Sequence, residues 1–468
     1  MYRIVITLFA TVFFFHSAAA GQSLNEQIEK LIKQQLPNAT VAVVVKDIAT
    51  NRVLYQRNAD KLLSPASGIK VYTAIAALYG LGPNYRFVTQ LFHKANQYYL
   101  RFGGSPSFKK EELTSLLSNL KQSMVNHQTK VVIDSSRFKS PDYPDGTSYD
   151  DMGWYYAAPD TAAIINENAV AYQFLPSQRA NLPVAVATNQ ANTGITIINH
   201  LKTASKQDKN NHCQFNIEVK PNNTMRLYGC MLKSKNPITM KLAVPNPLLR
   251  AKQEIKSRLT EQGIKLATPI NNGITPNDAE EIARIESVSL FKLVKRMLKK
   301  SNNIYANSIT KELGYSQTGE GSYKHGTFAI KKLISQNTKI NMKGVRLYDG
   351  EGTRYNLITA NHMVSLLAAV YKDKPMREFL LKALPQSSRS GSLEGRMHGT
   401  ALEGKVFAKT GSMHDIASLS GYVIDGAHSP LVFSIIINGL DKPLRNARAV
   451  EEKILLMVYQ SDVARRRG

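Results

Sequence analysis

The chain has 468 residues, of which 43% are hydrophobic and 20% charged, and this excludes wholesale disorder and fits a folded protein of two or three domains. Lysine and arginine total 60 against 35 acidic residues, a formal net charge of +25 that suggests an anionic partner. The single tryptophan and the lack of an aromatic-basic motif argue against nucleic acid. Carboxylate-rich polymers of a bacterial envelope suit the positive charge better, and the protein could associate loosely with the envelope through them. The alternative is a basic surface that has no specific partner.

The first twenty residues are typical of a secretory signal peptide. Arg3 precedes an apolar run over 4–15, and alanines at 18–20 match the small-x-small pattern of a cleavage site. We therefore expect cleavage before Gly21 and an exported, periplasmic protein. An uncleaved membrane anchor is the alternative, but the apolar run is short for a span.

Periodicity and turn residues predict the elements in chain order. A helix over 25–35 precedes a strand pair, 40–46 with 52–55, and then an alanine-rich helix that begins near Ser67. From about 86 to 267, short strand-like segments and many turn residues predict a β-rich insertion. The later predictions are helices over 279–300, 304–313 and 359–371, strands over 405–408, 417–424 and 431–437, and a closing helix over 449–460.

The two cysteines, Cys213 and Cys230, flank a predicted hairpin. Segments 214–219 and 224–228 have strand-like patterns around a turn at 221–223, which brings the cysteines nearly opposite each other. Export favours a disulfide between them, with two free thiols as the alternative. No second Cys or His pair stands at zinc-ligand spacing, so we expect no metal and no other cofactor.

Ser67 and Lys70 form an S-x-x-K pattern at the start of the alanine-rich helix. Residues three apart share a helix face, so the lysine amine can reach the hydroxyl. The pattern alone is weak, because it recurs at Ser107, Ser118, Ser136, Ser289 and Ser308. Ser67 differs from these in its place at a helix N-terminus, where backbone N–H groups and the helix dipole support developing negative charge.

Two further motifs follow Ser67 along the chain. Ser301-Asn302-Asn303 lies in a turn between two helical segments, and Lys409-Thr410-Gly411, followed by Ser412, lies at the end of a predicted strand. Taken singly, the first is also typical of a helix cap and the second of a protected strand edge. S-x-x-K, S-x-N and K-T-G in this order, on helix, turn and strand, are the arrangement of serine acyltransferases that bind penicillins.

These motifs and their flanks resemble the D-alanyl-D-alanine carboxypeptidase/endopeptidase family of the penicillin-binding protein four type, the class C low-molecular-mass penicillin-binding proteins. The resemblance covers nearly the whole mature chain, including SPASGIKVYTAIAALYGLGPNYRF, MLKKSNN, VVIDSSRF and DDMGWYYAAPDTAAIINENAV. It implies an α/β, penicillin-binding transpeptidase-like (serine β-lactamase-like) domain, an antiparallel sheet with helices on both sides. We expect this domain to comprise 21–85 and 268–468, insert domain II 86–160 and 241–267, and insert domain III 161–240.

The resemblance also implies how the site works. Ser67 would be the nucleophile and Lys70 its base, kept neutral part of the time by burial and by the nearby cation of Lys409. Ser301 would relay the proton to the leaving amine, and Asn303 would hold the substrate amide.

The remaining expected contacts concern the two ends of the substrate. Lys409 and Thr410 would receive its terminal carboxylate, and the backbone N–H groups of Ser67 and Ser412 would form the oxyanion hole. Asp151 in the insertion would bind the free amine of a diamino acid in the stem peptide. A plain turn or capping role is the alternative for Asp151.

Two loops depart from the family pattern. Asn302 stands in place of the aspartate of S-D-N, and we expect this change to alter the activity in degree rather than to abolish it. The D-G-S-G-L-S loop appears as D-G-E-G-T-R over 349–354, which leaves the contribution of this loop to substrate fit open. The expected activity is hydrolysis of peptidoglycan stem peptides, as carboxypeptidase, endopeptidase or both, with β-lactams as inhibitors. The alternatives are a β-lactamase or esterase, for which no carboxylate stands out in the sequence as a deacylating base, and a non-catalytic peptidoglycan-binding protein.

Overall fold

The computed structural model describes residues 22–120, 130–190, 193–210, 213–264, 266 and 268–467. The expected signal peptide at 1–20 lies outside the described residues. Within the described part of the chain, no helix is both long and apolar enough to cross a membrane.

A five-stranded antiparallel sheet joins the two ends of the chain. Its order is β14-β15-β16-β1-β2, and β1 pairs with β16 so that Thr40 lies opposite Asn438. The strands are β1 (Thr40–Asp47), β2 (Val53–Arg57), β14 (Val406–Met413), β15 (Ile416–Val423) and β16 (Leu431–Asn438). Every residue of β15 is buried, as expected of a strand covered on both faces. The predicted strand pair and the three predicted C-terminal strands are confirmed.

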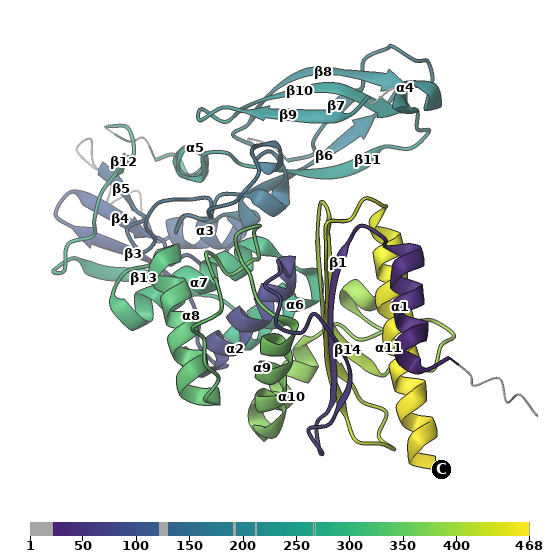
Figure 1. Cartoon of the computed structure of the whole chain (residues 1–468). Coiled ribbons are helices and arrows are strands. Elements are labelled where there is room, and N and C mark those ends of the chain that lie inside the picture. The colour runs from purple at the N-terminus through teal and green to yellow at the C-terminus, as the bar shows by residue number, and fades with distance from the viewer. Residues whose placement is uncertain are drawn as a thin grey trace, which may run out of the picture.

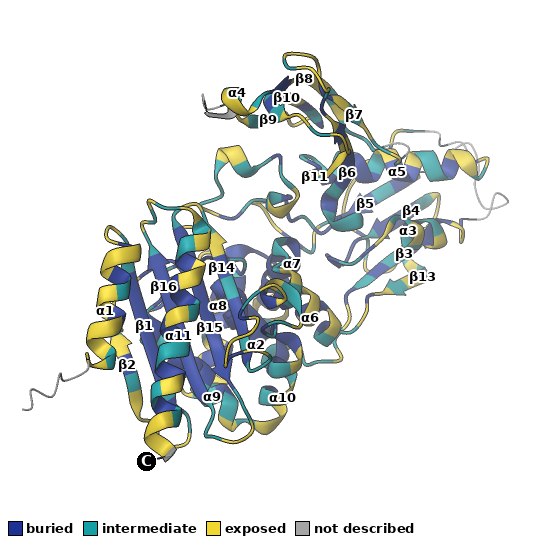
Figure 2. Ribbon diagram, turned by 90° about the vertical axis from the view of Figure 1, so that its right-hand side faces the viewer, coloured by how far each residue is buried: buried dark blue, intermediate teal, exposed yellow. Residues whose placement is uncertain are grey.

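Helices cover both faces of this sheet. On one face lie α1 (Leu24–Gln35) and α11 (Leu444–Arg467), whose outer sides are exposed in Figure 2. On the other face, α9 (Ala360–Lys372) packs directly on β16 and β1. Behind it lie α2 (Lys70–Gly80), α6 (Leu290–Lys300), α7 (Asn303–Thr318), α8 (Tyr323–Thr338) and α10 (Lys374–Ala383). The predicted helices at both ends of the chain and at α7 and α9 are confirmed, whereas α8 and α10 were not predicted.

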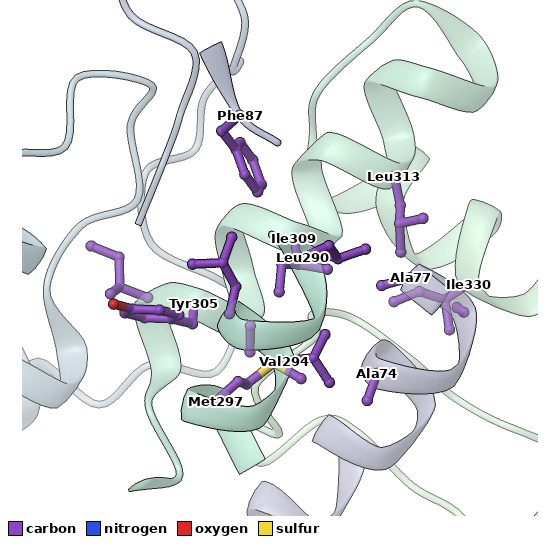
Figure 3. Close-up of a cluster of buried hydrophobic side chains, with 14 of the residues drawn as sticks. Ala74, Ala77, Phe87, Leu290, Val294, Met297, Tyr305, Ile309, Leu313 and Ile330 are labelled. Atoms are coloured by element: carbon purple, nitrogen blue, oxygen red, sulfur yellow. The ribbon is translucent and has the colours of Figure 1, made fainter. Parts of the chain in front are cut away.

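Small side chains allow α2 to run through the interior of this helical layer. Ala74 and Ala77 are fully buried, and they face Val294 of α6, Leu313 of α7 and Ile330 of α8 (Figure 3). Alanine lets neighbouring helices approach closely at native packing density. The start of α2, where Lys70 lies, is therefore inside the protein rather than on its surface.

The prediction of one helix over 279–300 is wrong for its first part. Residues Glu280–Glu286 form β13, which pairs with β3 (Val88–Lys94), and the helix begins only at Leu290. Pairing with a strand nearly two hundred residues away along the chain overrides the local helical tendency of this charged segment. The sheet has the order β12-β5-β4-β3-β13, completed by β4 (Gln97–Arg101), β5 (Lys130–Asp134) and β12 (Asn271–Asn272).

Two three-stranded sheets form the outer part of the insertion, at the top of Figure 1. Their strands are β6 (Ala169–Leu175), β7 (Ala185–Ala187), β8 (Thr196–Ala204), β9 (Phe215–Val219), β10 (Thr224–Leu232) and β11 (Ile238–Ala243). The predicted hairpin is β9 and β10, an antiparallel pair, and a disulfide joins Cys213 to Cys230, whose Cα atoms lie 5.7 Å apart. The helices of the insertion are α3 (Lys110–Leu117), α4 (Lys206–Asn210) and α5 (Pro247–Glu261).

Candidate active site

Ser67 lies in a short 3-10 turn, Ala66–Ile69, that leads directly into α2. The sequence predicted Ser67 at a helix N-terminus, and the turn that holds it runs directly into α2, which begins at Lys70. The expected contact is still made, because Lys70 Nζ lies 2.9 Å from Ser67 Oγ. Ala66 has a φ of 46°, a left-handed conformation that is strained for a residue with a Cβ and that is often found at functional sites.

Lys70 is completely buried, with 0% of its surface exposed. Besides Ser67, Nζ donates hydrogen bonds to Asn303 Oδ1 and to the backbone carbonyl of Glu351, both at 2.7 Å. Burial lowers the pKa of Lys70 to about 8, while the negative charges of Glu351 and Asp349 oppose this shift. A fraction of Lys70 is therefore neutral near pH 7 and able to accept a proton.

The S-x-N turn links α6 to α7. Ser301 ends α6 in a left-handed conformation with a φ of 53°, and Asn302 caps α7 through a hydrogen bond from the Tyr305 N–H. Asn302 also donates from Nδ2 to Glu167 Oε2 at 3.1 Å. An aspartate in this position would set one carboxylate against another, which gives a physical reason for the departure from S-D-N.

Asn303 connects the turn to the insertion as well as to Lys70. Its Nδ2 donates to the backbone carbonyl of Tyr156 at 2.7 Å. Tyr156 belongs to a short 3-10 turn, Tyr155–Ala157. The insertion therefore contacts the second motif directly.

Lys409 crosses from the sheet to the S-x-N turn. It is fully buried, and Nζ donates to Ser301 Oγ at 3.0 Å and to the Thr410 carbonyl at 2.6 Å. Burial, and then the like charge of Lys70, hold the pKa of Lys409 well below its usual value. The sequence predicted the K-T-G motif at the end of a strand. In the structure, residues 409–411 lie inside β14.

Thr410 and Ser412 lie closer to solvent. Thr410 Oγ1 donates to Ser392 Oγ at 2.8 Å, and the exposed Ser412 accepts a 3.4 Å hydrogen bond from Arg448 Nη2. Both belong to the same strand as Lys409, so the three predicted residues of this motif come together beside the nucleophile turn.

Gly411 is required by the approach of the nucleophile turn. A Cβ at this position would collide with the Pro65 carbonyl oxygen and with Ser418 Oγ, and Ser418 itself donates to that carbonyl at 2.6 Å. Glycine in a strand permits such a close approach of another backbone, here that of residue 65. Gly352, with a φ of 103°, similarly faces the Ala66 carbonyl.

A cleft of about 530 Å³ lies over Ser67. Residues of the three motifs, of the 349–354 loop and of the insertion line this cleft: Ser67, Ser301, Asn303, Glu351, Arg354, Ser412, His414, Ser148, Asp150, Asp151 and Tyr156. Asp151 lies in a 3-10 turn, Tyr149–Asp151, and accepts a 2.9 Å hydrogen bond from Tyr156 Oη. Asp151 therefore lies in the cleft that contains the predicted nucleophile. In the described part of the chain, no group of three or more His, Cys, Asp or Glu side chains is arranged to hold a metal ion.

Sequence reasoning gave no role to two residues that shape the site, Asp349 and Asn307. Asp349 accepts backbone N–H groups of Glu351 at 2.9 Å and Gly352 at 2.6 Å, and it thereby holds the D-G-E-G loop against Lys70. Asn307 donates from Nδ2 to Glu351 Oε2 at 2.7 Å. Asn307 follows Asn303 by four residues, so a shared face of α7 was the available signal for it.

The fold and the pairing of Ser67 with a buried lysine define a serine peptidase scaffold of the penicillin-binding type. The model of the D-Ala-D-Ala carboxypeptidase 3 (S13) family matches residues 24–457, and the chain belongs to this family. The resemblance identified from the motifs is confirmed.

Named relatives and a solved structure agree with this membership. The chain is 27% identical over 422 residues to D-alanyl-D-alanine carboxypeptidase DacB of Haemophilus influenzae, covering 87% of each chain. It is 28% identical over 453 residues to D-alanyl-D-alanine carboxypeptidase of Actinomadura sp., covering 91% of this chain and 83% of the relative. The crystal structure of penicillin binding protein 4 from H. influenzae superposes with a TM-score of 0.82 at 25% identity, covering 93% of this chain and 99% of that one.

Proposed function

We propose that this family member is an exported enzyme that cleaves peptidoglycan stem peptides through an acyl-enzyme on Ser67. It would act as a D-Ala-D-Ala carboxypeptidase, as an endopeptidase on D-Ala to diamino acid crosslinks, or as both, since the two reactions share one acyl-enzyme. The observation that carries the proposal is the 2.9 Å contact between Ser67 Oγ and the amine of a completely buried lysine. The net charge of +25 suits an anionic envelope polymer.

In the proposed acylation, neutral Lys70 accepts the Ser67 hydroxyl proton while Oγ bonds to the carbonyl carbon of a D-Ala residue. The C–N bond to the leaving group then breaks, and the leaving amine takes up a proton. Ser301 is the proposed relay for this proton, which is consistent with the 3.0 Å hydrogen bond between Ser301 Oγ and Lys409 Nζ. The backbone N–H groups of Ser67 and Ser412 would stabilise the oxyanion.

Substrate recognition would use the remaining predicted residues. Lys409 and Thr410 would bind the terminal carboxylate, whose negative charge favours the protonated form of the buried lysine. Asn303 would hold the scissile amide, and Asp151 would bind a free amine of the stem peptide. The position of Asp151 in the same cleft as Ser67 supports this role.

Intact-mass spectrometry after brief incubation with benzylpenicillin tests this function. We expect one covalent adduct per chain on the wild type and none on Ser67→Ala. Release of D-Ala from a stem pentapeptide and opening of a crosslinked dimer would then separate the two peptidase activities. A wild type that forms no adduct and leaves the penicillin intact would contradict the proposal and favour a non-catalytic binding protein.

A further inference from the structure

The D-G-E-G loop brings a carboxylate into the catalytic cleft. Glu351 lines this cleft together with Ser67 and Asn303. Its backbone carbonyl accepts a hydrogen bond from Lys70 Nζ, so the main chain of residue 351 lies against the proposed base. The loop cannot move freely, because the fully buried Asp349 accepts the backbone N–H groups of residues 351 and 352.

The Glu351 side chain is held by a second buried polar group. Asn307 is only 2% exposed, and its Nδ2 donates to Glu351 Oε2 at 2.7 Å. The other end of this amide, Oδ1, is buried and receives no hydrogen bond from any described residue. A buried acceptor without a donor is unfavourable, and a water molecule can satisfy it by donating a hydrogen bond.

Charged and titratable groups surround this carboxylate on every side. Lys70 faces it from α2, Asp349 from its own loop, Asp160 from the insertion and Tyr323 from α8. Burial and the neighbouring Asp349 raise the pKa of Glu351 to about 8, and the cation of Lys70 opposes this shift. A carboxyl group with a raised pKa is a stronger base once ionised than an exposed carboxylate.

We propose that Glu351, assisted by Asn307, is the general base that activates water for hydrolysis of the Ser67 acyl-enzyme. This inference rests on the proposed function and assigns the second half of its reaction. Penicilloyl esters on Ser67 would be hydrolysed by the same route as peptidyl esters.

The step balances with water as the only co-reactant. The water oxygen bonds to the acyl carbonyl carbon while Glu351 accepts one of its protons. The tetrahedral intermediate collapses as the bond from that carbon to Ser67 Oγ breaks. The proton held by Glu351 passes through a water molecule to Lys70 Nζ and from there to Oγ, which lies 2.9 Å from Nζ. The products are a free carboxylic acid and the regenerated serine.

The test measures acylation and deacylation separately in full-length wild type, Glu351→Gln and Glu378→Gln, with a fluorescent penicillin as the probe. Gln preserves the shape of the side chain and can still accept the hydrogen bond from Asn307, so the loop should keep its conformation. Glu378 is an exposed carboxylate on α10 and serves as the matched control for loss of one charge. Decay of the adduct is followed by intact mass after the free drug is removed.

We expect Glu351→Gln to be acylated at least as fast as the wild type and to lose its adduct roughly 100-fold or more slowly, within the usual range for loss of a general base. Glu378→Gln should match the wild type in both steps, and Glu351→Asp should recover part of the deacylation rate. Equal adduct lifetimes in wild type and Glu351→Gln, or a parallel fall in both rates, would overturn the role of Glu351 while leaving the acyl-enzyme function standing. A wild type that is never acylated would overturn both.

Discussion

Raising the pH from 6 to 9 should accelerate acylation of Ser67 by up to about 90-fold, which is the limit for a lysine that titrates alone with a pKa of about 8. Glu351 becomes ionised over the same range and keeps part of Lys70 protonated, which makes the rise smaller. Only neutral Lys70 can accept the serine proton, and its pKa of about 8 makes the neutral fraction about 1% at pH 6, about 9% at pH 7 and about 91% at pH 9. The rate should therefore rise nearly tenfold per pH unit below pH 7 and level off above pH 9. With an ordinary lysine pKa of 10.5 the rise would continue through pH 9 to beyond pH 10.

Burial and two carboxylates near Lys70 determine where this rise lies. Glu351 and Asp349 stabilise the charged lysine and move the profile to higher pH, whereas burial moves it lower and is the largest cause. The repulsion between the two lysines acts on Lys409, whose own pKa is lowered by burial and then by the charge of Lys70. Lys70→Arg should remove the rise, since a guanidinium does not deprotonate in this range, and should slow acylation by roughly 10²- to 10⁴-fold.

Stopped-flow acylation by a fluorescent penicillin, at concentrations well below saturation and at constant ionic strength, measures this profile. The amplitude at each pH reports whether the protein remains folded, and circular dichroism at pH 6 and pH 9 provides an independent control. A flat profile between pH 6 and 9 in the wild type would refute Lys70 as the titrating base. The same conclusion would follow if Lys70→Arg kept the wild-type profile.

Three further changes test the packing around the site. Asn302→Asp should destabilise the protein by about 1 kcal/mol in urea unfolding, because it sets a carboxylate against Glu167, and a second change, Glu167→Gln, should restore part of the loss. Gly411→Ala should cost about 1–3 kcal/mol and slow acylation, since its Cβ meets the nucleophile turn, whereas Gly395→Ala, with open space around it, should do neither; equal stability of the two variants would contradict this. Replacing both cysteines of the disulfide with serine should lower the unfolding free energy by about 3 kcal/mol and leave the acylation rate unchanged, because the bridge lies in the outer sheets.

The sequence alone was sufficient for the elements whose signal is local. The apolar runs of β1, β15 and β16 and the periodicity of α1 and α7 predicted these elements close to their observed bounds. The order of the three motifs led to the correct family. Local patterns suffice here because burial of both faces of a strand, or of one face of a helix, leaves its period in the residues themselves.

Only the tertiary structure decided features that depend on distant partners. Glu280–Glu286 is a strand because β3 lies beside it, and Lys70 is buried because neighbouring helices enclose α2. Lys409 reaches Ser301 across a separation of 108 residues, a contact that no local pattern encodes.

Glu351 shows the same limit at the site itself. In the sequence it was a departure of unknown effect within a loop, and no carboxylate stood out as a base. In the structure it lies in the cleft against Lys70 and Asn307, and its proposed role arises from those neighbours. The sequence by itself determined which side chains are available for chemistry. Folding determined their burial, and burial sets the pKa values on which that chemistry depends.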